Sequence, residues 1–304
     1  MNVSVVYGGT KEERDASYKN AKDIAEVLKE RGYRAGLIPF EHDIISTLRR
    51  ENTDVVYLCV QGKGYGDGTL QGILEHEKIP FTGSGMRAAS LINDKILCKL
   101  LFDKYDISTP KWRILCRKDY ENGDFSFDAS DYPFVAKAPT QGGSFGIELI
   151  RSREYLPNIG KVFEYDDPLL IEDYIDGRFF TVGLYESNGK LITLPVVEGI
   201  DLEKKEKETG GDLISFTGAY SARESSLDDK LAGRMEDMAR KVFDITGARA
   251  LARVDFMVDA NLVPYVLEIN AVPGLKRASL MPKEAMIAGI EYADMIEDIL
   301  KAAL

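Results

Sequence analysis

The sequence predicts an α/β protein built from three consecutive parts. In residues 1–85, short apolar strand segments alternate with segments of helical periodicity, which is the pattern of a parallel sheet with helices on its faces. From residue 112 onward, strand–turn–strand units replace that alternation and indicate an α+β arrangement. We expect the parts to be residues 1–94, 95–185 and 186–304, since a chain of 304 residues is long enough for several cores.

The first part is expected to hold three strands and three helices in alternation. The strands are predicted at residues 3–7, 34–39 and 54–60, and the helices at residues 16–31, 44–49 and 69–77. Two residues support these limits, because Gly32 follows the first helix and Asp67 lies where it can cap the third.

The later elements follow from periodicity and turn residues. The predicted elements are a helix at 86–108, strand pairs at 132–150 and 169–186, a helix at 226–246, a hairpin at 252–275 and a closing helix at 285–303. The stretch 199–225 is rich in acids, lysines and glycines and has few large apolar residues. We therefore expect it to form a mobile loop.

The hairpin carries the most informative polar pattern in the chain. Successive strand side chains alternate between faces, so Arg253 and Asp255 share a face of one strand, and Glu268 and Asn270 share a face of the other. Pairing about a turn at 259–262 would bring these four groups together among apolar neighbours. Carboxylate and amide oxygens suit Mg²⁺, and an arginine beside them can hold an oxyanion. The alternative is a solvated, salt-bridged sheet face.

A glycine-rich loop at residues 140–146 is the second candidate site. Glycines let backbone N–H groups approach a ligand, and such nests bind phosphates, here through Gly142, Gly143 and Ser144. Lys137 immediately precedes the loop and could contact a phosphate. Taken alone the loop is also compatible with an ordinary turn. Together with the hairpin it suits phosphoryl transfer, which depends on positioning and charge neutralisation.

Composition excludes several classes of function. A net charge of −11 and a pI of about 4.9 argue against nonspecific binding to nucleic acid or to an anionic membrane. No stretch of 18 apolar residues predicts a membrane span, and the N-terminus does not read as a signal peptide. Three cysteines without metal-like spacing indicate reduced thiols and a cytoplasmic protein.

Nine short motifs in order carry a family resemblance along nearly the whole chain. They are GGTKEERDAS (8–17), GDGTLQG (66–72), PFTGSG (80–85), DK (94–95), PFVAK with GGSFGI (133–147), IEDYIDGRFFTVG (171–183), LPVVE (194–198), RVDF (253–256) and LEINAVPGL (267–275). The chain resembles ATP-grasp ligases, and specifically the D-alanine–D-alanine ligase family. The resemblance implies an ATP-grasp fold with an N-terminal pre-ATP-grasp domain. It also implies an ATP-dependent ligase that joins two amino acids through an acyl phosphate.

The resemblance assigns the cofactor contacts. The residues that match Mg²⁺ ligands, with Mn²⁺ as the alternative ion, are Asp255, Glu268 and Asn270. Lys95 and Lys137 match lysines that bind the phosphates of ATP. Glu172 and Ile175 match the hinge that meets adenine.

The resemblance also assigns the substrate contacts. Arg253 and the backbone of Gly274 match the oxyanion site, and Glu13 matches the acid that holds the ammonium group of the first amino acid. Ser279 and Leu280 match the segment that binds the carboxylate of the second, and Tyr220 matches a tyrosine of the mobile loop. A homodimer is compatible with the resemblance.

Several positions depart from the family pattern. Gln61 lies where the family has a histidine that helps to hold the first amino acid, and Phe179 replaces a glutamate that binds the ribose. The other substituted positions are Gly66, Gly143, Asp173 and Ala219. Two alternatives therefore stay open beside D-alanyl-D-alanine synthesis: a related ligase with different amino acids, and a non-catalytic nucleotide-binding protein.

Overall fold

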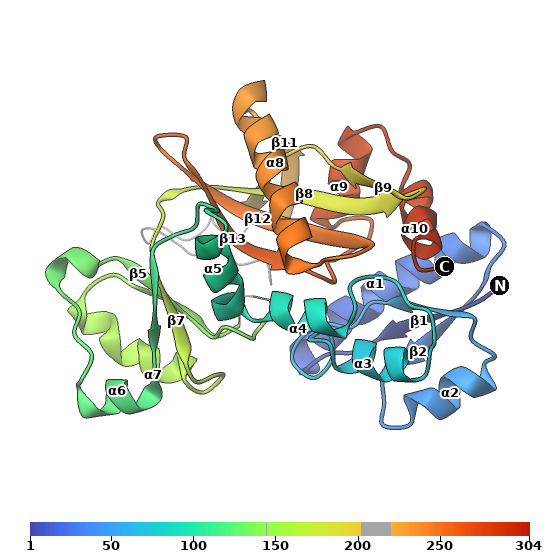
Figure 1. Ribbon diagram of the computed structural model, residues 1–304, viewed down its shortest axis with the longest axis horizontal. Helices are drawn as coiled ribbons and strands as arrows, with labels where there is room; N and C mark the ends of the chain where they lie inside the picture. Colours follow the sequence, from blue (N-terminus) through green and yellow to red (C-terminus); the bar gives the residue numbers. More distant parts are fainter. Residues whose placement is uncertain (144, 202–219) are drawn as a thin grey trace.

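The computed structural model describes residues 1–143, 145–201 and 220–304, which form three sheets. Figure 1 shows the N-terminal sheet at the right, a four-stranded sheet at the left and a six-stranded sheet above them. No helix in these ranges is long and apolar enough to cross a membrane.

The N-terminal sheet is parallel, as the alternation predicts, in the order β2-β1-β3. Its elements are β1 (Asn2–Tyr7), α1 (Lys11–Glu30), β2 (Arg34–Pro39), α2 (Ile44–Arg50), β3 (Val55–Leu58) and α3 (Thr69–His76). Both faces are covered, because Val3 and Val5 join a core with α1, whereas Val6 joins another with α2 and α3. Asp67 accepts hydrogen bonds from the backbone N and Oγ1 of Thr69, so it supports the start of α3.

The four-stranded sheet is antiparallel, in the order β4-β7-β5-β6. Its elements are β4 (Trp112–Leu115), α6 (Arg117–Asn122), β5 (Phe134–Lys137), β6 (Ile147–Ile150), α7 (Ile159–Val162) and β7 (Leu169–Asp173), with 3-10 turns η1 (Ala129–Asp131) and η2 (Arg153–Asn158). The strand–glycine loop–strand prediction is confirmed, since β5 and β6 pair across residues 138–146.

The six-stranded sheet follows the order β11-β10-β8-β12-β13, with β9 paired to β8. Its elements are β8 (Gly177–Ser187), β9 (Lys190–Thr193), β10 (Val197–Asp201), β11 (Tyr220–Glu224), α8 (Asp229–Thr246), β12 (Leu251–Asp259) and β13 (Pro264–Asn270). Buried residues of α8, β8 and β12 share one core. Both ends of the predicted loop 199–225 belong to the paired strands β10 and β11, and residues 202–219 lie outside the described residues.

Two predicted helices are each a pair of helices. The stretch 86–108 divides into α4 (Met86–Asn93) and α5 (Lys95–Lys104), because Asp94 adopts an extended backbone and its side chain caps α5 at Ile96 N and Leu97 N. The prediction of a single helix at 285–303 is wrong in the same way. It contains the end of α9 (Leu280–Ile287) and all of α10 (Tyr292–Lys301), and Gly289 between them has a φ of +73° that ends the first helix.

The N-terminal and C-terminal parts share a core. Ile24 and Leu28 of α1 lie in the same buried cluster as Ile296 and Ile299 of α10 and Leu251 of β12. This packing holds the first helix against the elements that carry the hairpin.

Candidate active site

The four polar residues of the β12–β13 hairpin lie together, as the alternation of the strands predicts. Arg253 pairs with Asn270 across the strands, and Asp255 pairs with Glu268. The guanidinium of Arg253 donates from Nε and Nη2 to the two oxygens of Asp255, at 2.7 Å each. The amide nitrogen of Asn270 donates to Asp255 Oδ2 at 3.1 Å, which leaves the amide oxygen out of that bond.

Strand β8 supports this cluster from the other side of β12. Thr181 lies opposite Asp255 in the register, and its hydroxyl donates to Asp255 Oδ1 at 3.0 Å. Burial raises the pKa of Asp255 in spite of the charge of Arg253 beside it. Burial acts in the same direction on Glu268, but the charges of Lys95 and Lys137 outweigh it and lower the pKa of Glu268. The sequence leaves open the alternative that these groups form a solvated sheet face. That alternative is wrong at Asp255, which is 3% exposed.

Lysines from two other elements approach the hairpin. Lys95 is the first residue of α5, and its Nζ lies 3.1 Å from Glu268 Oε2 and 2.8 Å from the carbonyl oxygen of Gln141. Lys137, at the end of β5, forms an ion pair with the carboxylate of Glu172 on β7. Burial alone would raise the pKa of Glu172, but Lys137 and Lys99 reverse this and hold it at about 2.

The glycine loop lies close to the N-terminal part. A Cβ built on Gly142 would lie 3.1 Å from Glu13 Oε1, and Gly143 adopts a φ of +60°. Glu13 is buried, and its Oε2 accepts a hydrogen bond from Thr10 Oγ1 at 2.8 Å. Ser144 lies outside the described residues.

Gln61 and Gly62 border the same acid. Gln61 donates its backbone N–H to the carbonyl of Gly8 at 3.0 Å, and its side chain is half-buried. Gly62 has a φ of +80°, and a Cβ there would overlap the carboxylate of Glu13. The site thus needs glycine at Gly62 for space as well as for backbone conformation.

The segment after the hairpin folds back on itself. A Cβ on Gly274 would lie 3.0 Å from the hydroxyl oxygen of Ser279, which is buried at the start of α9 together with Leu280. Asn20 of α1 holds this segment, because its Oδ1 accepts from the backbone N of Leu275 and of Lys276, at 3.2 and 2.8 Å.

In the described part of the chain, no contact joins the predicted site residues Ile175 and Tyr220 to the hairpin, the lysines or the glycine loop. Ile175 is half-buried between β7 and β8. Tyr220 is the first residue of β11, where its backbone pairs with Asp201. The side chain of Tyr220 lies outside the described part of the chain.

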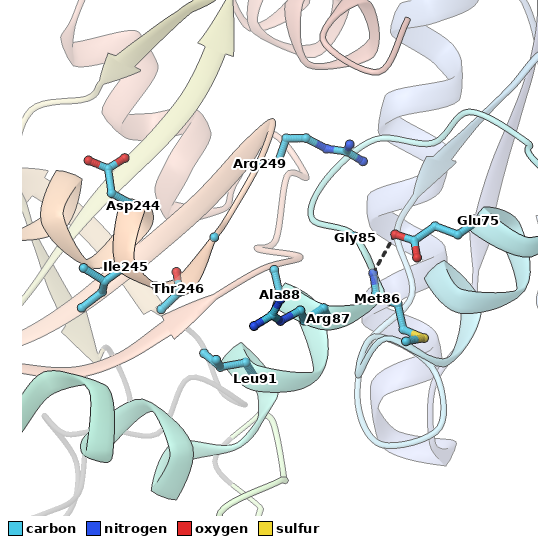
Figure 2. Close-up of a pocket in the computed structure, with 11 residues that line it drawn as sticks. Glu75, Gly85, Met86, Arg87, Ala88, Leu91, Asp244, Ile245, Thr246 and Arg249 are labelled. Atoms are coloured by element: carbon cyan, nitrogen blue, oxygen red, sulfur yellow. Dashed lines mark hydrogen bonds between the residues drawn. The ribbon is translucent and has the colours of Figure 1, made fainter. Parts of the chain in front are cut away.

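A surface hollow of about 460 Å³ lies away from all these residues, where α3, α4 and the end of α8 meet. Figure 2 shows Glu75 accepting a hydrogen bond from the backbone N of Met86 at one side of it, and Arg87 and Arg249 nearby. No predicted site residue lines this hollow. We place the candidate site at the hairpin instead, because lysine, arginine and carboxylate groups converge there.

Known proteins resemble this chain over its full length. Residues 101–301 match the family model described as D-ala D-ala ligase C-terminus. A D-alanine–D-alanine ligase from Carboxydothermus hydrogenoformans is 33% identical over 318 residues, which cover 100% of this chain and 98% of that protein. The chain belongs to the D-alanine–D-alanine ligase family.

The solved structures agree with this membership in the D-alanine–D-alanine ligase family. The crystal structure of such a ligase from Bacillus anthracis, complexed with ATP, has a TM-score of 0.82 and 27% identity, and the match covers 100% of this chain and 97% of that one. A relative from Syntrophotalea carbinolica is 32% identical over 99% of this chain and 95% of its own length. The ATP-grasp fold and the family resemblance read from the nine motifs are confirmed.

The structure also adds side chains that the sequence reasoning missed in this member of the D-alanine–D-alanine ligase family. These residues are Lys99, Thr181 and Glu284. Lys99 follows Lys95 by one helical turn, a spacing that signals a shared face. Glu284 follows Lys283 in the otherwise apolar helix α9, where a buried charged residue is unusual. Thr181 gave no signal apart from its place on a strand.

Proposed function

We propose that this chain is an ATP-dependent ligase that joins two D-alanine molecules. The observation that carries the proposal is the convergence of Arg253, Asp255, Glu268, Asn270 and Lys95 in a chain related to these ligases over its full length. ATP would transfer its γ-phosphoryl group to the carboxylate of the first amino acid. The amine of the second would then attack the acyl carbon, form the amide and release phosphate.

The donor set of the hairpin fits a divalent cation. Asp255 and Glu268 supply carboxylate oxygens, and Asn270 keeps an amide oxygen for a ligand, which are the hard donors that Mg²⁺ prefers. In the described ranges, no group of three or more His, Cys, Asp or Glu side chains could hold a metal. Water and phosphate oxygens would complete the shell, as is usual for Mg²⁺. When bound, Mg²⁺ or Mn²⁺ would neutralise charge on the phosphates.

The remaining nucleotide contacts come from the central sheet and α5. Lys95 and Lys137 would bind phosphates, as would the backbone N–H groups of the loop at Gly142, Gly143 and Ser144. The segment from Glu172 to Ile175 would meet adenine.

The amino acids would lie between the N-terminal part and the hairpin. Glu13 would hold the ammonium group of the first amino acid beside Gln61. The segment at Ser279 and Leu280 would hold the carboxylate of the second. Arg253 and the Gly274 backbone would stabilise the negative charge that develops in the transition state. Tyr220 would correspond to the tyrosine of the family's mobile loop.

The proposal includes three further statements. The parts 1–94, 95–185 and 186–304 are taken as domains, the protein acts in the cytoplasm where ATP is available, and a homodimer is its assembly. Size-exclusion chromatography with light scattering tests the last statement, and a monomer at all concentrations would reject it.

A second candidate is a ligase of the same type with another first amino acid. Gln61 is neutral where relatives carry a histidine, and a site that lacks a polar contact to its substrate loses discrimination. Phosphate release from ATP, measured with a panel of D- and L-amino acids, separates the candidates. The highest kcat/KM for D-alanine supports the first, a higher value for another amino acid supports the second, and no release with any amino acid would leave a nucleotide-binding protein.

A further inference from the structure

A buried cluster of two lysines and one glutamate lies next to the candidate nucleotide site. Glu172 on β7 forms ion pairs with Lys99 of α5 through Oε1 and with Lys137 of β5 through Oε2. The side chain of Lys99 is 0% exposed and that of Glu172 is 2% exposed, whereas that of Lys137 is 12% exposed. Lys137 is therefore the member of the cluster that a ligand can reach.

Lys99 also connects the sheets. Its Nζ donates to the hydroxyl of Thr109, and that hydroxyl donates to the carbonyl oxygen of Val266 at 2.7 Å. Val266 lies in β13, two residues before Glu268. Lys99 thus ties α5 to the central sheet through Glu172 and to the hairpin through Thr109.

The charges of the cluster do not cancel. Burial lowers the pKa of Lys99, and the ion pair with Glu172 opposes that shift. With both lysines as ammonium groups facing one carboxylate, the cluster carries one net positive charge. Because Lys99 is enclosed by protein, a ligand would meet the net positive charge of the cluster at Lys137. Without Lys99, Glu172 and Lys137 would form a neutral pair.

We propose that Lys99 is a positioning residue that engages Glu172 and so leaves Lys137 with a net positive charge for the phosphates of ATP. This inference rests on the proposed function, in which Lys137 contacts a phosphate. A purely structural role of the cluster would not make nucleotide affinity depend on charge. The inference does, because it predicts that nucleotide affinity follows the summed charge of Lys99, Glu172 and Lys137.

The test compares Lys99→Met with the double variant Lys99→Met/Glu172→Gln. The single variant makes the pair around Lys137 neutral, and the double variant restores one net positive charge with side chains of similar size. A charge-assisted contact contributes about 1.5–3 kcal/mol, so we expect Lys99→Met to weaken ATP binding at least about tenfold in titration calorimetry. We expect the ratio of ATP affinity to adenosine affinity in the double variant to return to within about threefold of the wild-type ratio.

Two controls separate charge from structure. Lys104→Met changes an exposed lysine of the same helix and should leave ATP affinity at the wild-type value. Adenosine carries no phosphate, so Lys99→Met should leave its dissociation constant unchanged. Glu172 lies in the segment proposed to meet adenine, so the ATP affinity of the double variant is divided by its adenosine affinity before it is compared with the wild type. Replacing a buried ion pair by neutral groups of similar volume is often close to neutral for stability, so the double variant is expected to fold even if Lys99→Met does not.

The outcomes are distinct. A double variant whose ratio of ATP affinity to adenosine affinity is as low as that of Lys99→Met, or lower, would overturn the inference. A loss of adenosine binding in Lys99→Met equal to its loss of ATP binding would also overturn it. If only the double variant folds, a wild-type ratio of ATP affinity to adenosine affinity supports the inference and a tenfold lower ratio overturns it. Wild-type protein that binds ATP but ligates no amino acid would reject the proposed function while the comparison of variants still decides the role of Lys99. Wild-type protein that binds no ATP would reject both.

Discussion

Glu284 is a buried carboxylate whose replacement should change the pH dependence of stability. It projects from α9 onto β8, where its Oε2 accepts a hydrogen bond from the backbone N of Gly183 at 2.5 Å. Within the described ranges its Oε1 has no hydrogen-bond partner. Gly183 lies opposite Arg253 in the sheet, and the charges of Arg253 and Asp255 both act on Glu284. Burial outweighs the attraction of Arg253 and raises the pKa of Glu284 from 4.5 to about 8.

The sign of the effect follows from proton binding. Between pH 4.5 and about 8 the folded protein keeps a proton on Glu284 that the unfolded chain releases, so stability falls as pH rises through this window. At about 1.4 kcal/mol per pH unit, the whole window corresponds to roughly 5 kcal/mol. Between pH 5 and pH 9 the wild type should lose roughly 4 kcal/mol through this one group.

Glu284→Gln removes the titration and keeps the shape, and its amide oxygen can still accept from Gly183. We expect the variant to match the wild type at pH 5 and to be more stable by roughly 4 kcal/mol at pH 9, or roughly 8 °C in melting temperature. Thermal unfolding followed by circular dichroism at both pH values measures this difference. The exposed Glu291→Gln is the matched control and should show no such change. The same difference between variant and wild type at pH 5 and pH 9, or a less stable variant at pH 9, would refute the reasoning.

Three further predictions concern the site itself. Glu268→Gln should abolish amino-acid-dependent phosphate release with the fold retained, because the amide lacks the negative charge that the carboxylate offers to a divalent cation. Unchanged turnover at ordinary Mg²⁺ would reject the assignment. Arg253→Ala should lower kcat by about 10²- to 10³-fold, the usual cost of losing one oxyanion donor. If ATP affinity collapses instead and kcat survives in steady-state assays, Arg253 is a binding residue. Gly62→Ala should displace the Glu13 carboxylate, since the new Cβ would overlap it, and raise KM for the first amino acid at least about tenfold with ATP affinity kept. An unchanged KM would show that Glu13 does not hold the substrate.

The sequence by itself determined the parts of this protein that depend on short-range rules. Strand alternation was enough to put Arg253 and Asp255 on one face, and the turn after β12 was enough to bring Glu268 and Asn270 beside them. The parallel N-terminal sheet followed from the strand–helix alternation. Asp94 shows a limit of this reading, because its capping role was present in the sequence and a long helical pattern concealed it.

Only the tertiary structure decided which charges meet across distant elements. Lys99 and Glu172 are separated by 73 residues, and their ion pair exists because α5 packs between the central sheet and the hairpin. Glu284 lies against Gly183 only because α9 folds onto β8, which turns a carboxylate with an ordinary pKa into one that keeps its proton near neutral pH. Local periodicity is set by a few covalent neighbours, whereas burial and ion pairing are set by the packing of whole elements, which no short window of sequence contains.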